Sequence, residues 1–344
     1  MLHLGIDFGF DQVKIAAVEH GLFGARLSST SQMPIPPKSI TKNGLEPASA
    51  LVTAARLALQ KSNLHFGRHQ RVTSAIPASL VLTKRLELPA MPHHELANSI
   101  SFEAGQSFPI PIDELIIDWL IIPNAQSKKI NQTVVLLVGA PRALVTGLVG
   151  LFDQLGLQLL GLEIKPLANA RAVTAVGDTS CFLLVDIGAV ESSIAVVDHG
   201  VVIHVTSLDF GASQLQDSKS HALKILPAIP PDLLPPREGQ TKATNQNKKR
   251  KGLPLKDTVK SLALEIMSLL KYSAQHLALG AFKEIRLCGG NSQIEGLATA
   301  LADLTGIPTT LANPLARLTP DKNQGAKQLL PFTTAIGLAL RKDF

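Results

Sequence analysis

Two stretches of the chain repeat one pattern of apolar and polar positions. Residues 4–21 (LGIDFGFDQVKIAAVEHG) and 183–200 (LLVDIGAVESSIAVVDHG) align without a gap at an offset of 179 residues, with eight identities. Each copy reads as an apolar strand ending in Asp-x-Gly, a short loop, a second strand, an acidic-His-Gly turn and a third strand. Chance similarity of two apolar hairpins is the alternative, but eight ungapped matches favour a duplicated β-meander and two similar halves that face each other.

Apolar residues at helical spacing predict further elements of each half. Such stripes predict helices over residues 47–62, 257–279 and 293–305. Residues 285–288 read as a short buried strand that ends at Gly289-Gly290, just before the last of these helices. Each half is therefore expected to be an α/β unit.

Two regions interrupt this pattern. Residues 76–160 predict a small inserted α/β subdomain, with strands near 79–88, 115–122 and 133–139 and helices near 93–107 and 143–155. Residues 219–254 are rich in proline and, from 239 to 252, almost entirely polar or basic. We expect this second region to be a flexible excursion and not a packed element.

Composition and charge narrow the class of protein. The 344 residues suggest about two domains, and 45% hydrophobic with 17% charged residues excludes wholesale disorder. Two cysteines exclude a disulfide framework and a four-cysteine metal site, and no secretory signal is visible, so we expect a soluble intracellular protein. Residues 219–256 carry nine basic and two acidic side chains, which accounts for the net charge of +6 and leaves the rest near neutral. A nucleic-acid partner is therefore not expected.

The two Asp-x-Gly tips carry the first candidate chemistry. Facing each other, Asp7-x-Gly9 and Asp186-x-Gly188 would form a phosphate and metal clamp, because glycine lets backbone amides approach phosphate oxygens. Asp7 and Asp186 would hold Mg²⁺ through its waters. Lys14, on the strand leaving the first tip, is the expected charge partner of a β- or γ-phosphate. Ordinary turn chemistry is the alternative explanation for a single Asp-x-Gly.

A third glycine turn adds a candidate nucleoside site. Residues 286–297 (RLCGGNSQIEGL) place a Gly-Gly pair between a buried strand and a helix start, which predicts a cavity for a planar, polar ligand. The alternative is a tight strand-to-helix turn with no ligand.

These motifs together resemble the actin, Hsp70 and sugar-kinase ATPase superfamily. The order is strand-DxG-strand twice, then CGGNSQIEGL, then TTAIGLAL at residues 333–340. Within the superfamily the chain resembles the PilM family of type IV pilus assembly proteins, which is related to the division protein FtsA. Residues 84–122 (KRLELPAMPHHELANSISFEAGQSFPIPIDELIIDWLII) and 151–173 (LFDQLGLQLLGLEIKPLANARAV) are the parts most similar to that family.

The resemblance implies a two-lobed actin-like α/β fold, a duplicated ribonuclease-H-like architecture with an inserted 1C subdomain. It implies subdomain 1A at residues 1–75, 161–178 and 313–344, 1C at 76–160, and 2A at 179–215 and 281–312. A reduced subdomain 2B would occupy residues 216–280, with a flexible basic, proline-rich loop near 227–254.

The resemblance also implies ATP with Mg²⁺ between the lobes. Residues matching the family's nucleotide site are Asp7, Gly9, Gln12, Lys14, Asp186, Gly188, Ala189, Ser192, Ser193, Gly211, Lys224, Gly289, Gly290 and Asn291, with Asp7 and Asp186 near the metal. No catalytic residue is assigned. Phe10 and Asp11 replace the small or hydroxyl residues usual after the first tip glycine, which removes donors and adds repulsion. We therefore expect nucleotide binding rather than turnover.

The expected role is docking. Members of the family bind the short cytoplasmic amino-terminal tail of a PilN-like inner-membrane protein in a groove between 1A and 1C, and are linked through it to PilO and PilP. The chain is accordingly expected to be cytoplasmic and peripheral to the inner membrane, and a homo-oligomer is compatible with this role. The alternatives are an FtsA-like division filament protein and a small-molecule kinase of the same superfamily.

Overall fold

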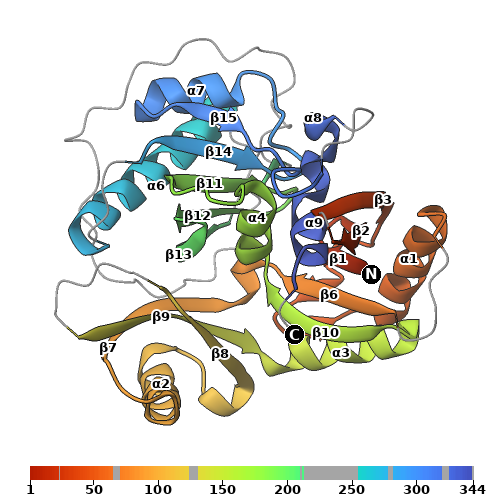
Figure 1. Cartoon of the computed structure of the whole chain (residues 1–344), viewed down its shortest axis with the longest axis horizontal. Coiled ribbons are helices and arrows are strands. Elements are labelled where there is room, and N and C mark those ends of the chain that lie inside the picture. The colour runs from red at the N-terminus through yellow and green to blue at the C-terminus, as the bar shows by residue number, and fades with distance from the viewer. Residues whose placement is uncertain are drawn as a thin grey trace.

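A computed structural model describes residues 1–22, 24–64, 70–123, 131–209, 211–212, 255–277, 282–319 and 325–342. The first lobe is built on a five-stranded sheet in the order β10-β6-β1-β2-β3 (Figure 1). β1 to β3 form an antiparallel meander, while β6 and β10 run parallel to β1. The strands are β1 (Leu2–Phe8), β2 (Gln12–Gly21), β3 (Gly24–Pro34), β6 (Arg71–Ile76) and β10 (Gln158–Ile164).

The second lobe repeats this sheet. Its order is β13-β12-β11-β14-β15, again an antiparallel meander followed by two parallel strands. The register of the meander shifts between Ala17 and Val18 in the first lobe and between Val196 and Val197 in the second, positions that are 179 residues apart. The predicted duplication is therefore confirmed, and both copies share the same register shift. The strands are β11 (Cys181–Ile187), β12 (Ser192–Asp198), β13 (Val201–Leu208), β14 (Glu284–Cys288) and β15 (Thr309–Leu311).

Helices cover the outer faces of both sheets. α1 (Ala48–Lys61) packs on the first sheet and buries Leu51, Ala55 and Ala58, the apolar stripe that predicts it. A short hairpin, β4 (Ile40–Thr41) and β5 (Gly44–Leu45), precedes α1. α6 (Leu255–His276) and α7 (Leu297–Thr305) pack on each other beside the second sheet (Figure 1). α7 begins four residues later than predicted, because Gly296 adopts a left-handed φ of 78° and precedes the helix.

The inserted unit has its own sheet and core. β7 (Leu82–Pro89), β9 (Gln132–Pro141) and β8 (Leu115–Ile121) form an antiparallel sheet in that order, with β8 at an edge. α2 (His93–Ser107) covers it and buries Leu96 and Ile100 against Leu86, Val135 and Leu137. Two 3₁₀ turns, η1 (Ala78–Leu80) and η2 (Ile112–Glu114), flank the strands. α3 (Arg142–Leu155) continues from β9 but packs against α1 and β5 of the first lobe, so we propose a boundary of 1C nearer residue 141 than 160.

Two short helices cross where the lobes meet. α4 (Lys165–Val173) follows β10, and α9 (Thr333–Ala339) follows α8 (Ala326–Leu329) and η4 (Leu330–Phe332). A Cβ added to Gly337 of α9 would lie 1.8 Å from the carbonyl oxygen of Ala168 in α4, and one added to Gly5 of β1 would lie 1.9 Å from that of Ala335. Glycine at both positions is therefore what allows α9 to fit between β1 and α4.

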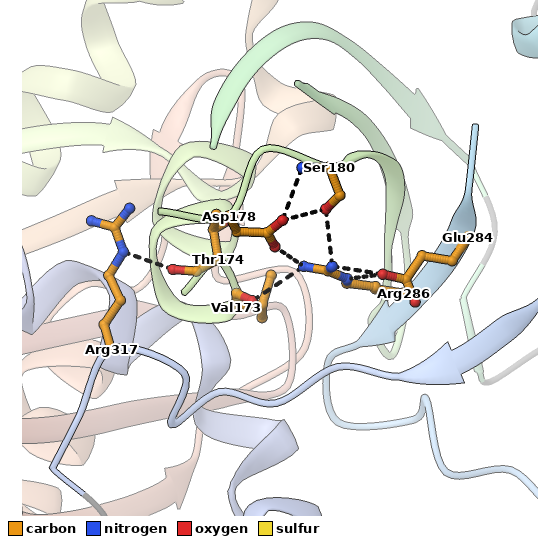
Figure 2. A network of polar contacts seen from close by, with 7 residues as sticks. All are labelled: Val173, Thr174, Asp178, Ser180, Glu284, Arg286 and Arg317. Atoms are coloured by element: carbon orange, nitrogen blue, oxygen red, sulfur yellow. Dashed lines mark hydrogen bonds and ion pairs between the residues drawn. The ribbon is translucent and has the colours of Figure 1, made fainter. Parts of the chain in front are cut away.

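A polar network fastens the far end of α4 to the second lobe (Figure 2). Arg286 of β14 pairs with Asp178 (3.0 Å) and Glu284 (2.6 Å), and its guanidinium lies 3.8 Å from the centre of the Phe182 ring. Ser180 donates to Asp178 at 2.5 Å. Burial alone would raise the pKa of Asp178, but the hydrogen bonds from Ser180 and Arg286 hold that pKa below its usual range.

The structure does not test every prediction about the domains. The division into subdomains 1A, 1C, 2A and 2B stays a prediction, and of 2B the structure describes only residues 255–277. The basic, proline-rich segment near 227–254 lies outside the described residues. Within the described part of the chain, no helix combines the length and apolarity needed to cross a membrane.

Candidate functional site

The two Asp-x-Gly tips meet at one cleft between the lobes. Asp7 and Gly9 end β1, Asp186 and Gly188 end β11, and all four line the cleft together with the Gly289-Gly290 turn after β14. The tips have the same backbone turn, since the Gly9 N–H donates to the Gln12 carbonyl (2.8 Å) and the Gly188 N–H to the Glu191 carbonyl (3.0 Å). These two amides are therefore used inside the turns and are not available to a phosphate.

Ten of the fourteen predicted site residues line this cleft. They are Asp7, Gly9, Lys14, Asp186, Gly188, Ala189, Ser192, Ser193, Gly289 and Gly290. Gln12, Gly211 and Asn291 lie beside it: the Gln12 carbonyl closes the first turn, a Cβ on Gly211 would be 2.5 Å from the Ala189 backbone, and the Asn291 N–H donates to the Ile187 carbonyl. Lys224 lies outside the described residues.

A lysine that the sequence analysis did not single out holds the first carboxylate. Lys165, the first residue of α4, places its Nζ 2.9 Å from Oδ1 of Asp7, as an ion pair rather than a well-aligned hydrogen bond. Both side chains are almost completely shielded from solvent, at 11% and 5% exposed. Burial lowers the pKa of Lys165, but Asp7, Glu191 and Asp186 together raise it, so that its pKa lies above the usual lysine value. The lysine is therefore a cation.

The second carboxylate is held by an amide. Asn169, one turn further along α4, donates from Nδ2 to Oδ2 of Asp186 at 2.9 Å, and its Oδ1 accepts from the Thr334 hydroxyl of α9 at 2.8 Å. A Cβ on Gly289, whose φ is 91°, would lie 2.1 Å from Oδ1 of Asp186. Burial raises the pKa of Asp186, and Lys165 only partly opposes this. The Gly-Gly turn thus gives this carboxylate the space it needs.

Glu191 is a further acid in the cleft, which Asp7, Asp11 and Asp186 also line. It follows the second tip and corresponds to Gln12 in the first repeat, because the two positions are 179 residues apart. Burial, opposed by Lys165 and increased by Asp186, raises the pKa of Glu191 to about 7. Its Oε2 accepts from the Ser79 N–H at 3.3 Å, which joins the second lobe to the 3₁₀ turn at the start of the inserted unit.

The arrangement does not fit a magnesium ion on Asp7 and Asp186. Oxygens of both carboxylates already contact Lys165 and Asn169, and no group of three or more His, Cys, Asp or Glu side chains in the described residues is arranged to hold a metal. A phosphate fits better, because the Ser192 hydroxyl is buried in the cleft wall without a hydrogen-bond partner among the described residues. Lys14 also lines the cleft. The cavity itself measures only about 40 Å³, which is room for a few water molecules.

The residues Glu191, Lys165 and Asn169 at the cleft were not predicted from the sequence. The alignment of the two repeats could have identified Glu191, because it aligns with Gln12. Lys165 and Asn169 lie in the stretch most similar to the PilM family, but a lysine at a helix start carries no pattern that points into a cleft. Only the crossing of α4 between the lobes brings them there.

A second cavity lies between the first lobe and the inserted unit. It measures about 280 Å³ and is mostly apolar. Two strands that border it, β8 and β10, are the edge strands of their sheets. We call this cavity the 1A–1C groove. Its lining residues are Ile76, Val81, Ile116, Asp118, Trp119, Leu120, Val138, Ala140, Val145, Leu162, Glu163, Ile164, Leu167 and Arg341.

Solved structures share this architecture. The structure described as a PilM-PilN type IV pilus biogenesis complex is similar with a TM-score of 0.77 and 21% identity, over 98% of this chain and 97% of that one. The ethanolamine utilization protein EutJ from Carboxydothermus hydrogenoformans is similar with a TM-score of 0.52 and 12% identity, over 99% of this chain and 89% of that one. The fold is thus the two-lobed actin-like α/β fold that the resemblance implies, with the two similar halves that the duplicated meander predicts.

The family follows from the sequence as a whole. The model of the family described as type IV pilus assembly protein PilM matches residues 5–343, a span that includes both repeats, the inserted unit and the crossing helices. The chain therefore belongs to the PilM family of type IV pilus assembly proteins.

Proposed function

We propose that this chain is a cytoplasmic docking protein of type IV pilus assembly, which binds the amino-terminal tail of a PilN-like inner-membrane protein in the 1A–1C groove. The groove is the observation that carries this proposal, because it is the larger of the two cavities described above and is mostly apolar. Family membership favours docking over an FtsA-like filament protein or a small-molecule kinase. Through this partner the chain would be peripheral to the inner membrane and linked to PilO and PilP.

The borders of the groove suit an extended peptide. An edge strand presents unpaired N–H and C=O groups, and a peptide that adds to it gains main-chain hydrogen bonds while alternate side chains enter pockets. On β8, Ile116, Asp118 and Leu120 share the face that lines the groove. The pattern of two apolar residues around a carboxylate predicts a partner with apolar anchors and a basic group between or beside them.

A charge placed on this face tests the groove. Ile116→Lys introduces an ammonium among apolar side chains and should weaken binding of a labelled PilN-like tail peptide by at least about tenfold in fluorescence anisotropy. Ile121→Lys is the matched control, because Ile121 is similarly exposed (47% against 37%) on the other face of the same strand and does not line the groove. Equal affinity of both variants and the unmodified protein would place docking elsewhere.

The cleft between the lobes is the proposed nucleotide site. Lys14 and the unpartnered hydroxyl of Ser192 would face the phosphates, and the Gly289-Gly290 turn would border the nucleoside. Because the cavity is much smaller than the pockets of about 300–1,000 Å³ that hold such ligands, the lobes would have to move apart about the α4–α9 crossing for a nucleotide to enter.

Titration of a fluorescent ATP analogue tests this part separately. Lys14→Met should lower the affinity by about tenfold or more, since a phosphate loses its charge partner. Lys61→Met is the control, because Lys61 is an exposed lysine in the last turn of α1 in the same lobe. Equal affinities of the two variants would mean that the nucleotide does not use this cleft, and would leave peptide docking unaffected.

A further inference from the structure

We propose that the ammonium of Lys165 is the resident cation of the cleft and takes the place that the repeat-related carboxylates of Asp7 and Asp186 would otherwise give to a divalent metal. A divalent ion would then reach the cleft only as part of a metal-nucleotide complex, held by phosphates and not by the protein. The geometry of the cleft places the ammonium there whether or not a nucleotide binds.

The contact with Asp7 is the first support. An ammonium 2.9 Å from Oδ1 of Asp7 fills space next to that oxygen which an ion or an ion-bound water would need. Mg²⁺ needs near-octahedral oxygen ligands and retains several waters, so it cannot share this space with a second cation. The position is also a dry one, because both side chains are almost fully buried.

The second carboxylate, Asp186, also has a hydrogen-bond partner from α4. Asn169 donates to Oδ2 of Asp186, and glycine at position 289 leaves the space that Oδ1 occupies, since a Cβ there would lie 2.1 Å from it. Asn169 is itself held by the Thr334 hydroxyl. Lys165 and Asn169 are four residues apart on one helix, so a single turn of α4 supplies the partner of each carboxylate.

The position of Lys165 in its helix argues against a role in helix stability. The first residue of a helix lies at the positive end of the helix dipole, where a carboxylate is favourable and a cation is not. Pro166 follows at the start of α4 and fixes the direction in which the chain enters the helix. A lysine is tolerated there because Asp7, Glu191 and Asp186 surround its ammonium with negative charge.

Manganese binding to the protein alone tests the proposal without any nucleotide. Electron paramagnetic resonance counts free Mn²⁺ during a titration. The unmodified protein should show no saturable site in the cleft, whereas Lys165→Met should bind Mn²⁺ at least about tenfold more tightly. Lys14→Met removes the same charge from the same cleft but leaves Lys165 on Asp7, and should bind Mn²⁺ no more than about two- to threefold more tightly than the unmodified protein.

A melting experiment provides the second readout. Mn²⁺ should raise the melting temperature of Lys165→Met, because an ion that binds only the folded state stabilises it, and should leave that of the unmodified protein unchanged. If Lys165→Met does not fold, the unmodified protein still decides the matter. A saturable Mn²⁺ site in it that Asp186→Asn removes would overturn the proposal, as would equal Mn²⁺ affinities of Lys165→Met and Lys14→Met.

Discussion

Substituting alanine for Gly337 should destabilise the protein, although the same change normally favours a helix. The added Cβ would lie 1.8 Å from the Ala168 oxygen, and contacts below 3.0 Å essentially never occur, so α4 and α9 must separate by more than an ångström. α9 cannot simply retreat, because residues 335 and 337 lie on opposite faces of the helix and the Ala335 oxygen already abuts Gly5 of β1.

The size of the effect follows from two opposing contributions. Overpacking a well-packed core costs about 1–3 kcal/mol, and this contact is among backbone atoms that cannot change rotamer, which puts it at the upper end. Alanine in place of glycine returns up to about 1 kcal/mol through helix propensity. We therefore expect a net loss of about 2 kcal/mol in the free energy of unfolding, or a fall of about 0.7 M in the urea midpoint at a slope near 3 kcal/mol/M.

Gly150→Ala is the matched control for this prediction. Gly150 lies inside α3, and a Cβ there would meet nothing within 4 Å, so the change should stabilise the protein by about 0.5–1 kcal/mol. Urea unfolding followed by circular dichroism at 222 nm measures both variants. Gly337→Ala with a midpoint equal to or above that of the unmodified protein would refute the tight crossing of α4 and α9.

Three further outcomes follow from charged side chains of the fold. The pKa of Glu191 is raised from 4.5 to about 7. Its contribution to stability is therefore fully present below about pH 4.5 and is lost as the pH rises through 7. Between pH 4.5 and 8 the free energy of unfolding should fall, relative to that of Glu191→Gln, by up to about 3 kcal/mol. Arg171 pairs with both oxygens of buried Glu163 (2.6 and 2.7 Å), so Arg171→Met should cost about 3 kcal/mol in urea unfolding, and adding Glu163→Gln should recover part of it. The pKa of Asp178 is lowered, so its contribution is present at neutral pH and lost as the pH falls through that pKa; Asp178→Asn should flatten the acid limb of the stability curve below about pH 4, and an unchanged limb would contradict the network in Figure 2.

The duplicated sheets were predictable because their signal is local and occurs twice. Ile6, Ile15 and Val18 are buried in the first lobe, and their counterparts Val185, Ile194 and Val197 are buried in the second. The central strands β1 and β11 are buried on both faces and read as near-continuous apolar runs, so aligning these runs also aligns the Asp-x-Gly tips. Convergence of the tips on one cleft therefore followed from the sequence.

The chemistry inside the cleft was less predictable, for a physical reason. Glycine at the tips permits close approach of a phosphate, but it equally permits the tight turn in which Gly188 donates to Glu191, and the sequence does not distinguish the two. The partners of the carboxylates come from α4, far in the chain from the first tip and 17 residues before Asp186 in the case of Asn169. Their placement depends on how two helices cross, which depends on Gly5 and Gly337 more than on any motif in α4.

Helix α4 is where the symmetry of the duplication breaks. Each half supplies one acid at its tip, but the partners Lys165 and Asn169 both come from α4, and Thr334 of α9 holds Asn169 from behind. Leu167, midway between them in the sequence, points the other way and lines the 1A–1C groove, as residues two apart on a helix must. One face of α4 thus contacts the two tip carboxylates, while the opposite face borders the proposed docking site. A duplicated pair of acids has in this way become an asymmetric site, in which a lysine and an amide of one helix partner both carboxylates.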